Sequence, residues 1–90
     1  MSIEEIMETL GLRKVTMLVK VDDERMAQGM RPWTVVLSGT LGEQVFARAD
    51  SSSLGECFQE IIKDFNNRQG DWGWLTELFQ RYLDASQVLD

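Results

Sequence analysis

The sequence contains no histidine, one cysteine and one proline. Histidine is the commonest general base and metal ligand in proteins, so its absence removes the usual partner of a catalytic nucleophile. A single cysteine excludes an internal disulfide framework and suits a reducing compartment, which predicts a cytoplasmic protein. The apolar runs are only a few residues long, so we expect no membrane-spanning helix and no signal peptide.

Basic residues are scarce as well. Nine Lys and Arg against fifteen Asp and Glu leave a formal net charge of −6. Because phosphate contacts are made by clustered Lys and Arg, we expect no direct binding of nucleic acid. A chain of 90 residues that is 43% hydrophobic predicts one compact domain, residues 1–90, with a modest core.

Hydrophobic periodicity predicts an α+β fold with the order α-β-β-β-α-α. Period-two alternation predicts three strands, and apolar stripes with helical spacing predict three helices. The economical arrangement is a three-stranded antiparallel sheet with the helices packed on one face. The predicted elements are a helix over residues 2–10, strands over 13–22, 32–38 and 43–49, and helices that begin near Ser53 and Asp71.

Capping and turn residues mark the predicted element ends. Ser2 with Glu5, and Ser53 with Glu56, are capping boxes at helix starts, and Asp71 is a plausible N-cap for the last helix. We expect Gly11 to end the first helix in the left-handed conformation. Two glycines, at positions 39 and 42, bracket a short hairpin loop, whereas the polar stretch over residues 22–31 is too long for a tight turn.

The sequence predicts a non-catalytic protein without a cofactor. Cys57 has no histidine to act as its base and lies on an apolar helix stripe, which favours a buried structural thiol. The run over residues 51–53 lacks the G-x-S-x-G pattern of a nucleophile elbow. Residues 64–70 resemble a calcium loop only distantly, because Gln69 stands where the sharp-turn glycine belongs. Whether Asp22, Asp23 and Glu24 bind a cation is left open by the sequence.

Three surfaces are candidates for binding a partner, and the first is acidic. Glu56, Glu60 and Asp64 are spaced i, i+4, i+8, so their side chains line up along one side of the predicted helix. Evenly spaced carboxylates of this kind can imitate a row of phosphates. The alternative is a solvated helix face, on which Lys63 and Arg68 make local ion pairs.

The second surface is the outer face of the predicted sheet. Strand alternation places Leu18, Val36 and Phe46 on the side opposite the core, and the rim residues are Lys14, Lys20 and Arg48. An apolar centre with a charged rim is typical of a protein interface. The alternative is that a helix crosses over and covers this face.

The third surface is the edge of the last helix. Trp74 and Leu78 lie beside the apolar stripe, near Glu77 and Arg81, where an aromatic side chain could be half exposed. Tryptophan and arginine are enriched at interface hot spots. The alternative is that Trp74 packs on a small core.

The order of these features resembles that of a known group. Residues 33–40 (WTVVLSGT), a glycine hairpin, a strand ending in Asp50 and an acidic helix are similar to small orphan proteins of phages and mobile elements. The element order with its acid excess also resembles one class of anti-CRISPR proteins, over about residues 32–83. The resemblance lies in spacing and order, so no functional residue is carried over from the family.

The resemblance implies a protein-binding inhibitor of phage or mobile-element origin. Our leading hypothesis is that the acidic surface blocks a host nucleic-acid enzyme by occupying its basic groove. The alternative is a self-associating structural or adaptor protein, such as a homodimer, that uses the apolar sheet face.

Overall fold

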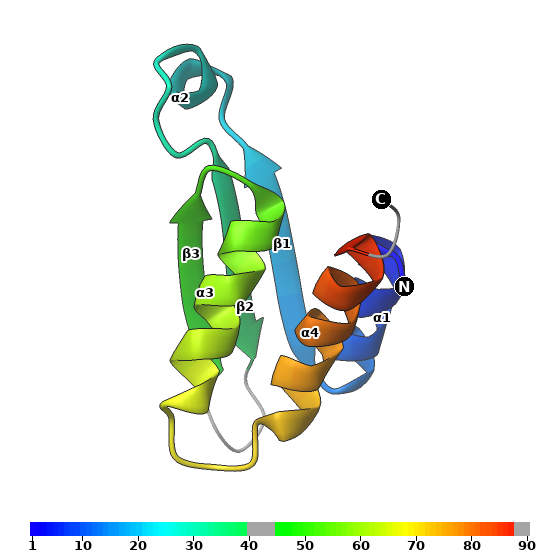
Figure 1. The fold of residues 1–90 in the computed structure, drawn as a ribbon. Coiled ribbons are helices and arrows are strands. Elements are labelled where there is room, and N and C mark those ends of the chain that lie inside the picture. The colour runs from blue at the N-terminus through cyan, green and yellow to red at the C-terminus, as the bar shows by residue number, and fades with distance from the viewer. Residues whose placement is uncertain (40–44, 88–90) are drawn as a thin grey trace.

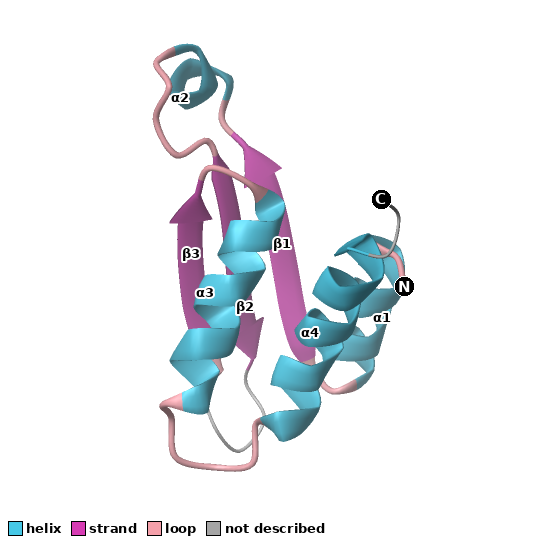
Figure 2. Cartoon of the chain, viewed as in Figure 1, coloured by secondary structure: helices cyan, strands magenta, loops and turns pink. Residues whose placement is uncertain are grey.

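The computed structural model describes residues 1–39 and 45–87. Its three strands form one antiparallel sheet in the order β1-β2-β3, which confirms the predicted α+β class and α-β-β-β-α-α order (Figures 1 and 2). A short helix, α2, is added between the first two strands. The elements are α1 (Ile3–Leu12), β1 (Val15–Val21), α2 (Asp23–Ala27), β2 (Trp33–Gly39), β3 (Phe46–Ser51), α3 (Leu54–Asn66) and α4 (Gly73–Gln87).

The core lies between the sheet and a layer of helices on one side of it. Figure 1 shows α3 in front of β2 and β3, with α4 beside α3 and α1 next to α4. The helical spacing of α3 turns Phe58, Ile61 and Phe65 toward the sheet, where all three are buried. The Phe58 ring also lies 4.7 Å from that of Phe79 and 5.3 Å from that of Tyr82, so α4 packs closely on α3.

Two predicted helix ends are wrong. Gly11 lies inside α1, which runs on to Leu12, and the left-handed residue that follows the helix is Lys14, with φ 65°. The α4 helix begins at Gly73, so its N-cap position belongs to Trp72 and not to Asp71; the Trp72 carbonyl oxygen accepts from the amides of Leu75 and Thr76. Both errors are shifts of one to three residues, and in both cases the observed residue is not the one favoured by capping preferences.

The first connection between strands holds the short helix α2, which the polar composition of residues 22–31 did not predict. Asp22 caps it, since one of its carboxylate oxygens accepts from the backbone amide of Arg25 at 3.1 Å. The strand predicted over 43–49 is observed at Phe46–Ser51. The glycine at position 42, predicted to bracket the hairpin loop, lies outside the described residues, as do residues 43 and 44 of the predicted strand.

Candidate interaction surfaces

The outer face of the sheet carries three apolar side chains, which we call the sheet patch: Leu18, Val36 and Phe46. Strand register places Leu18 directly opposite Val36. Phe46 lies opposite Ser38, which is two residues further along β2 than Val36. Leu18 is 55% exposed and Phe46 is 60% exposed. No helix among the described residues covers this face, so the alternative of a crossing helix is wrong.

The rim of the sheet patch is basic, in part as predicted. Lys20 and Arg48 are exposed and lie on the same face as the patch by strand alternation. Lys14 precedes β1 in a left-handed turn, so the alternation that predicted its position does not extend to it. Arg48 is paired with Asp50, with its Nε 3.0 Å from Oδ2 of the carboxylate.

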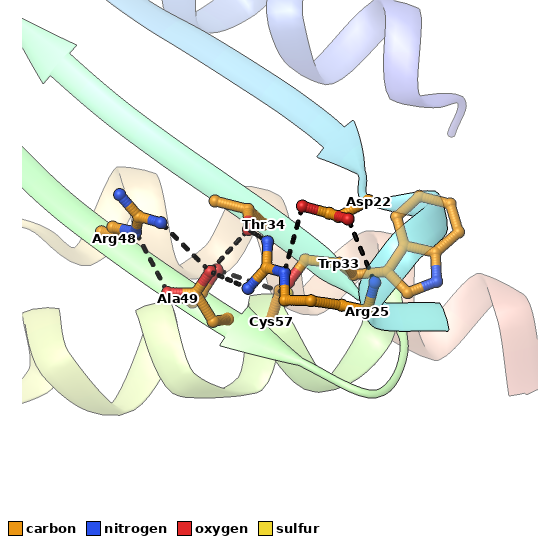
Figure 3. Close-up of polar contacts among 8 residues, drawn as sticks. Asp22, Arg25, Trp33, Thr34, Arg48, Ala49 and Cys57 are labelled. Atoms are coloured by element: carbon orange, nitrogen blue, oxygen red, sulfur yellow. Dashed lines mark hydrogen bonds and ion pairs between the residues drawn. The ribbon is translucent and has the colours of Figure 1, made fainter. Parts of the chain in front are cut away.

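Next to the patch lies a polar network that sequence reasoning missed, formed by Asp22, Arg25, Thr34, Arg48 and Asp50. Arg25 reaches from α2 to Thr34 Oγ1 at 3.0 Å and to Asp50 Oδ1 at 3.3 Å. The Thr34 hydroxyl donates to Asp50 Oδ1 at 2.5 Å. Figure 3 shows the guanidinium groups of Arg25 and Arg48 on either side of this cluster. The network therefore fastens α2 to the end of the sheet.

The electrostatics of the network keep Asp50 ionised. The hydrogen bond from Arg48 lowers the pKa of Asp50 most, and those from Thr34 and Arg25 also lower it. Burial acts in the opposite direction, and the pKa is about 2. The backbone amide of Arg25 likewise lowers the pKa of Asp22. The sequence did contain one signal of this network. Arg48 and Asp50 have opposite charges and are two residues apart on a strand, so they lie on the same face. The contacts of Arg25 with Thr34 and Asp50 could not be predicted, because the sequence did not indicate the helix α2 that positions Arg25.

An open depression of about 600 Å³ lies beside this network, between α2 and the start of α3. Arg25, Arg31 and Asp50 supply its charged groups. Arg25 is already bonded to Asp22, Thr34 and Asp50, and an entering anion would meet the Asp50 carboxylate. These groups hold α2 against the sheet. The depression therefore does not offer several free hydrogen-bond donors that point toward one ligand.

The predicted acidic row lies on the exposed side of α3, but its members differ in their partners. Glu56 accepts from the backbone amide of Ser52 at 3.3 Å and so takes part in capping the helix. Asp64 accepts two hydrogen bonds of 2.9 Å from the Arg68 guanidinium. Glu60 forms no ion pair with any of the described residues. The alternative of local ion pairs thus applies at Asp64, and the row is less negative than its spacing suggests.

Arg68 links this helix to the sheet. Its guanidinium lies 4.2 Å from the centre of the Phe65 ring and donates to the backbone carbonyl oxygen of Phe46. Because Gly39 bonds the carbonyl of Val45, the carbonyl of Phe46 points away from β2, to the free edge of β3. Arg68 therefore blocks part of an edge strand, which limits pairing with other strands there.

Trp74 is half-buried and makes an intramolecular contact. The Arg13 guanidinium lies 4.4 Å from the centre of its ring, which ties the end of α1 to the start of α4. Leu78, predicted at the edge of the apolar stripe, is buried. Both observations favour the packing interpretation of this segment.

Cys57 and the acidic loop residues also have structural roles. The Cys57 thiol is fully buried, with its sulfur 3.6 Å from the carbonyl oxygens of Trp33 and Ala49, and burial raises the pKa of the thiol. Asp22 caps α2, and Asp23 and Glu24 occupy its first turn, where carboxylates favour the helix dipole. Within residues 1–39 and 45–87, no group of three His, Cys, Asp or Glu side chains has the geometry to hold a metal ion.

No family model, curated protein or solved structure matches this chain. None of the helices in the described part of the chain is both long enough and apolar enough to cross a bilayer.

Proposed function

We propose that this protein works by stoichiometric contact with another protein, and that the outer face of the sheet is the contact surface. The observation that carries the proposal is the exposure of Leu18 and Phe46 on a face that no described helix covers. Large exposed apolar side chains grouped within a polar rim are typical of interaction sites. The polar network stiffens the neighbouring end of the sheet, which reduces the entropy lost on binding.

Substitution of the most exposed member of the patch tests this function. Phe46→Asp should abolish capture of the partner from host lysate, because it places a carboxylate within the apolar contact. The circular dichroism spectrum should be unchanged, since the ring is 60% exposed and contributes little to the core.

Leu12→Asp is the matched control, since Leu12 is 85% exposed on α1 and lies outside the sheet patch. It should leave capture intact. Equal capture by the wild type and the Phe46→Asp variant, or loss of capture by both variants, would show that the sheet patch is not the contact surface.

A second candidate function is the inhibition of a host nucleic-acid enzyme through the acidic side of the helical layer, as the resemblance to anti-CRISPR proteins implies. The observation that favours it is the position of Glu60, which is exposed on α3 with no ion pair among the described residues. The exposed carboxylates of α1, at Glu4, Glu5 and Glu8, lie in the same helical layer. A field of this sign steers basic partners toward the helices.

A further inference from the structure

The charge that borders the sheet patch has the opposite sign to the net charge of the chain. The network pairs Asp22 and Asp50 with Arg25 and Arg48, so these four charges balance one another. Lys20 then remains as an exposed cation next to Leu18, with no ion pair among the described residues. A chain with a net charge of −6 therefore has one positive charge, that of Lys20, beside the apolar residues of this face.

The shape of the patch indicates the kind of segment that fits it. From Leu18 to Phe46 the patch extends over two strand spacings across the sheet and two residues along it, which is about 12 Å. Two turns of an α-helix rise by about 11 Å, so apolar side chains at i, i+3 or i+4, and i+7 match this length.

We infer that the sheet patch binds an amphipathic helix of a partner protein whose apolar stripe is bordered by carboxylates. The inference rests on the proposed function and adds the chemistry of the partner. The apolar stripe covers Leu18, Val36 and Phe46, while the bordering carboxylates face Lys20. A second copy of this chain is the less complementary occupant, because packing two such faces together brings two positive rims into one interface.

Two synthetic helical peptides of about 18 residues test the inference against the full chain. Both carry the same leucine stripe, which is bordered by glutamate in one peptide and by lysine in the other. Fluorescence anisotropy of the labelled peptides should give about tenfold tighter binding for the glutamate-bordered peptide at low salt, and this difference should shrink as salt is added.

Three variants locate the binding site. Phe46→Ser should weaken binding of the glutamate-bordered peptide by about tenfold, because the most exposed apolar contact of the patch is lost. Lys20→Glu should weaken binding of that peptide and strengthen binding of the lysine-bordered one. Lys63→Glu makes the same charge change on the helical layer and should alter neither affinity by more than about twofold.

The outcomes separate this inference from the proposed function. Equal affinity for the two peptides, or an unchanged preference in the Lys20→Glu variant, would overturn the inference. If neither peptide binds while sedimentation shows a dimer that Phe46→Asp dissociates, the occupant is a second copy, and the sheet patch remains the contact surface. If the Phe46→Asp variant also captures the partner as well as the wild type does, the proposed function is wrong too.

Discussion

Thr34 lies on the outer face of the sheet and yet is only 2% exposed. Arg25 and Asp50 cover it, and its hydroxyl bonds to both of them. A buried hydroxyl is stabilising only when its partners are present, so the three side chains depend on one another. The stability of this group of three side chains therefore depends on whether Asp50 is ionised.

The contribution of Asp50 to stability should be lost in acid. Its pKa is about 2 in the folded protein, against an ordinary value of 3.8, so the unfolded chain takes up the proton first as the pH falls. The stabilisation is complete above about pH 5 and is lost between about pH 4 and pH 2; allowing for the partial exposure of the pair, it amounts to about 1 kcal/mol.

Urea denaturation of the wild type and Asp50→Asn at several pH values measures this effect. The difference in the free energy of unfolding should shrink as the pH is lowered from 5 toward 2.5. The control is Glu60→Gln, which changes an exposed carboxylate outside the network and should show no such trend. A constant difference for Asp50→Asn across this range would contradict the role of its charge.

The buried thiol of Cys57 should be unreactive in the native state. Burial raises its pKa, so the thiolate that reacts with disulfide reagents is scarce at neutral pH. Modification should follow unfolding, and Cys57→Ala should lower the free energy of unfolding by about 1–2 kcal/mol. Rapid labelling of the native protein, or a turnover reaction that depends on Cys57, would argue against a purely structural role.

At the scale of elements, the end of α1 allows a test with two substitutions. Lys14 has φ 65°, a conformation that costs a residue with a Cβ atom more than it costs glycine. Gly11 lies within the helix, and a Cβ atom added there would meet nothing within 4 Å. Lys14→Gly and Gly11→Ala should therefore each raise the free energy of unfolding by about 0.5–1 kcal/mol.

Thermal or urea unfolding of the two variants decides between the observed and the predicted helix end. If Gly11 were the left-handed residue, as its position in the sequence suggested, Gly11→Ala would destabilise the protein and Lys14→Gly would not stabilise it. If the two substitutions changed the free energy of unfolding in the direction opposite to that expected, the helix end predicted from the sequence would be the correct one.

The elements show which features were predictable. Strand alternation placed Leu18, Val36 and Phe46 on one face correctly, because side chains alternate strictly along a strand. The short helix α2 has no buried residue, so it left no apolar periodicity to detect. The contact of Arg68 with the carbonyl of Phe46 joins residues far apart in the chain, and a single sequence contains no signal for such a pair.

At the scale of the whole molecule, charge is distributed unevenly between the two faces. Exposed carboxylates gather on the helical layer, whereas the sheet patch has a basic rim. The two candidate functions use these opposite faces, so charge reversals distinguish them. Asp64 is unsuitable for this purpose, because lysine there would break the contact with Arg68.

If the protein inhibits a nucleic-acid enzyme, Glu60→Lys should slow association with that enzyme about fivefold at low salt, because steering depends on long-range attraction. Stopped-flow or biosensor rates over a salt series measure the effect. Glu4→Lys, which makes the same change on α1, should have the smaller effect because it lies outside the carboxylate row. Identical association rates for the wild type and Glu60→Lys at all salt concentrations would exclude this second function.

The position of α4 also has a consequence for how the protein is made. Phe58 of α3 packs on Phe79 and Tyr82, and α1 contacts α4 as well, so α4 packs against both α1 and α3. Chains emerge from the ribosome N-terminus first, so α1, the sheet and α3 are synthesised before the segment that shields them. Until α4 emerges, the side of the Phe58 ring that packs on Phe79 and Tyr82 has no partner. The topology therefore delays completion of the core until translation has passed α4.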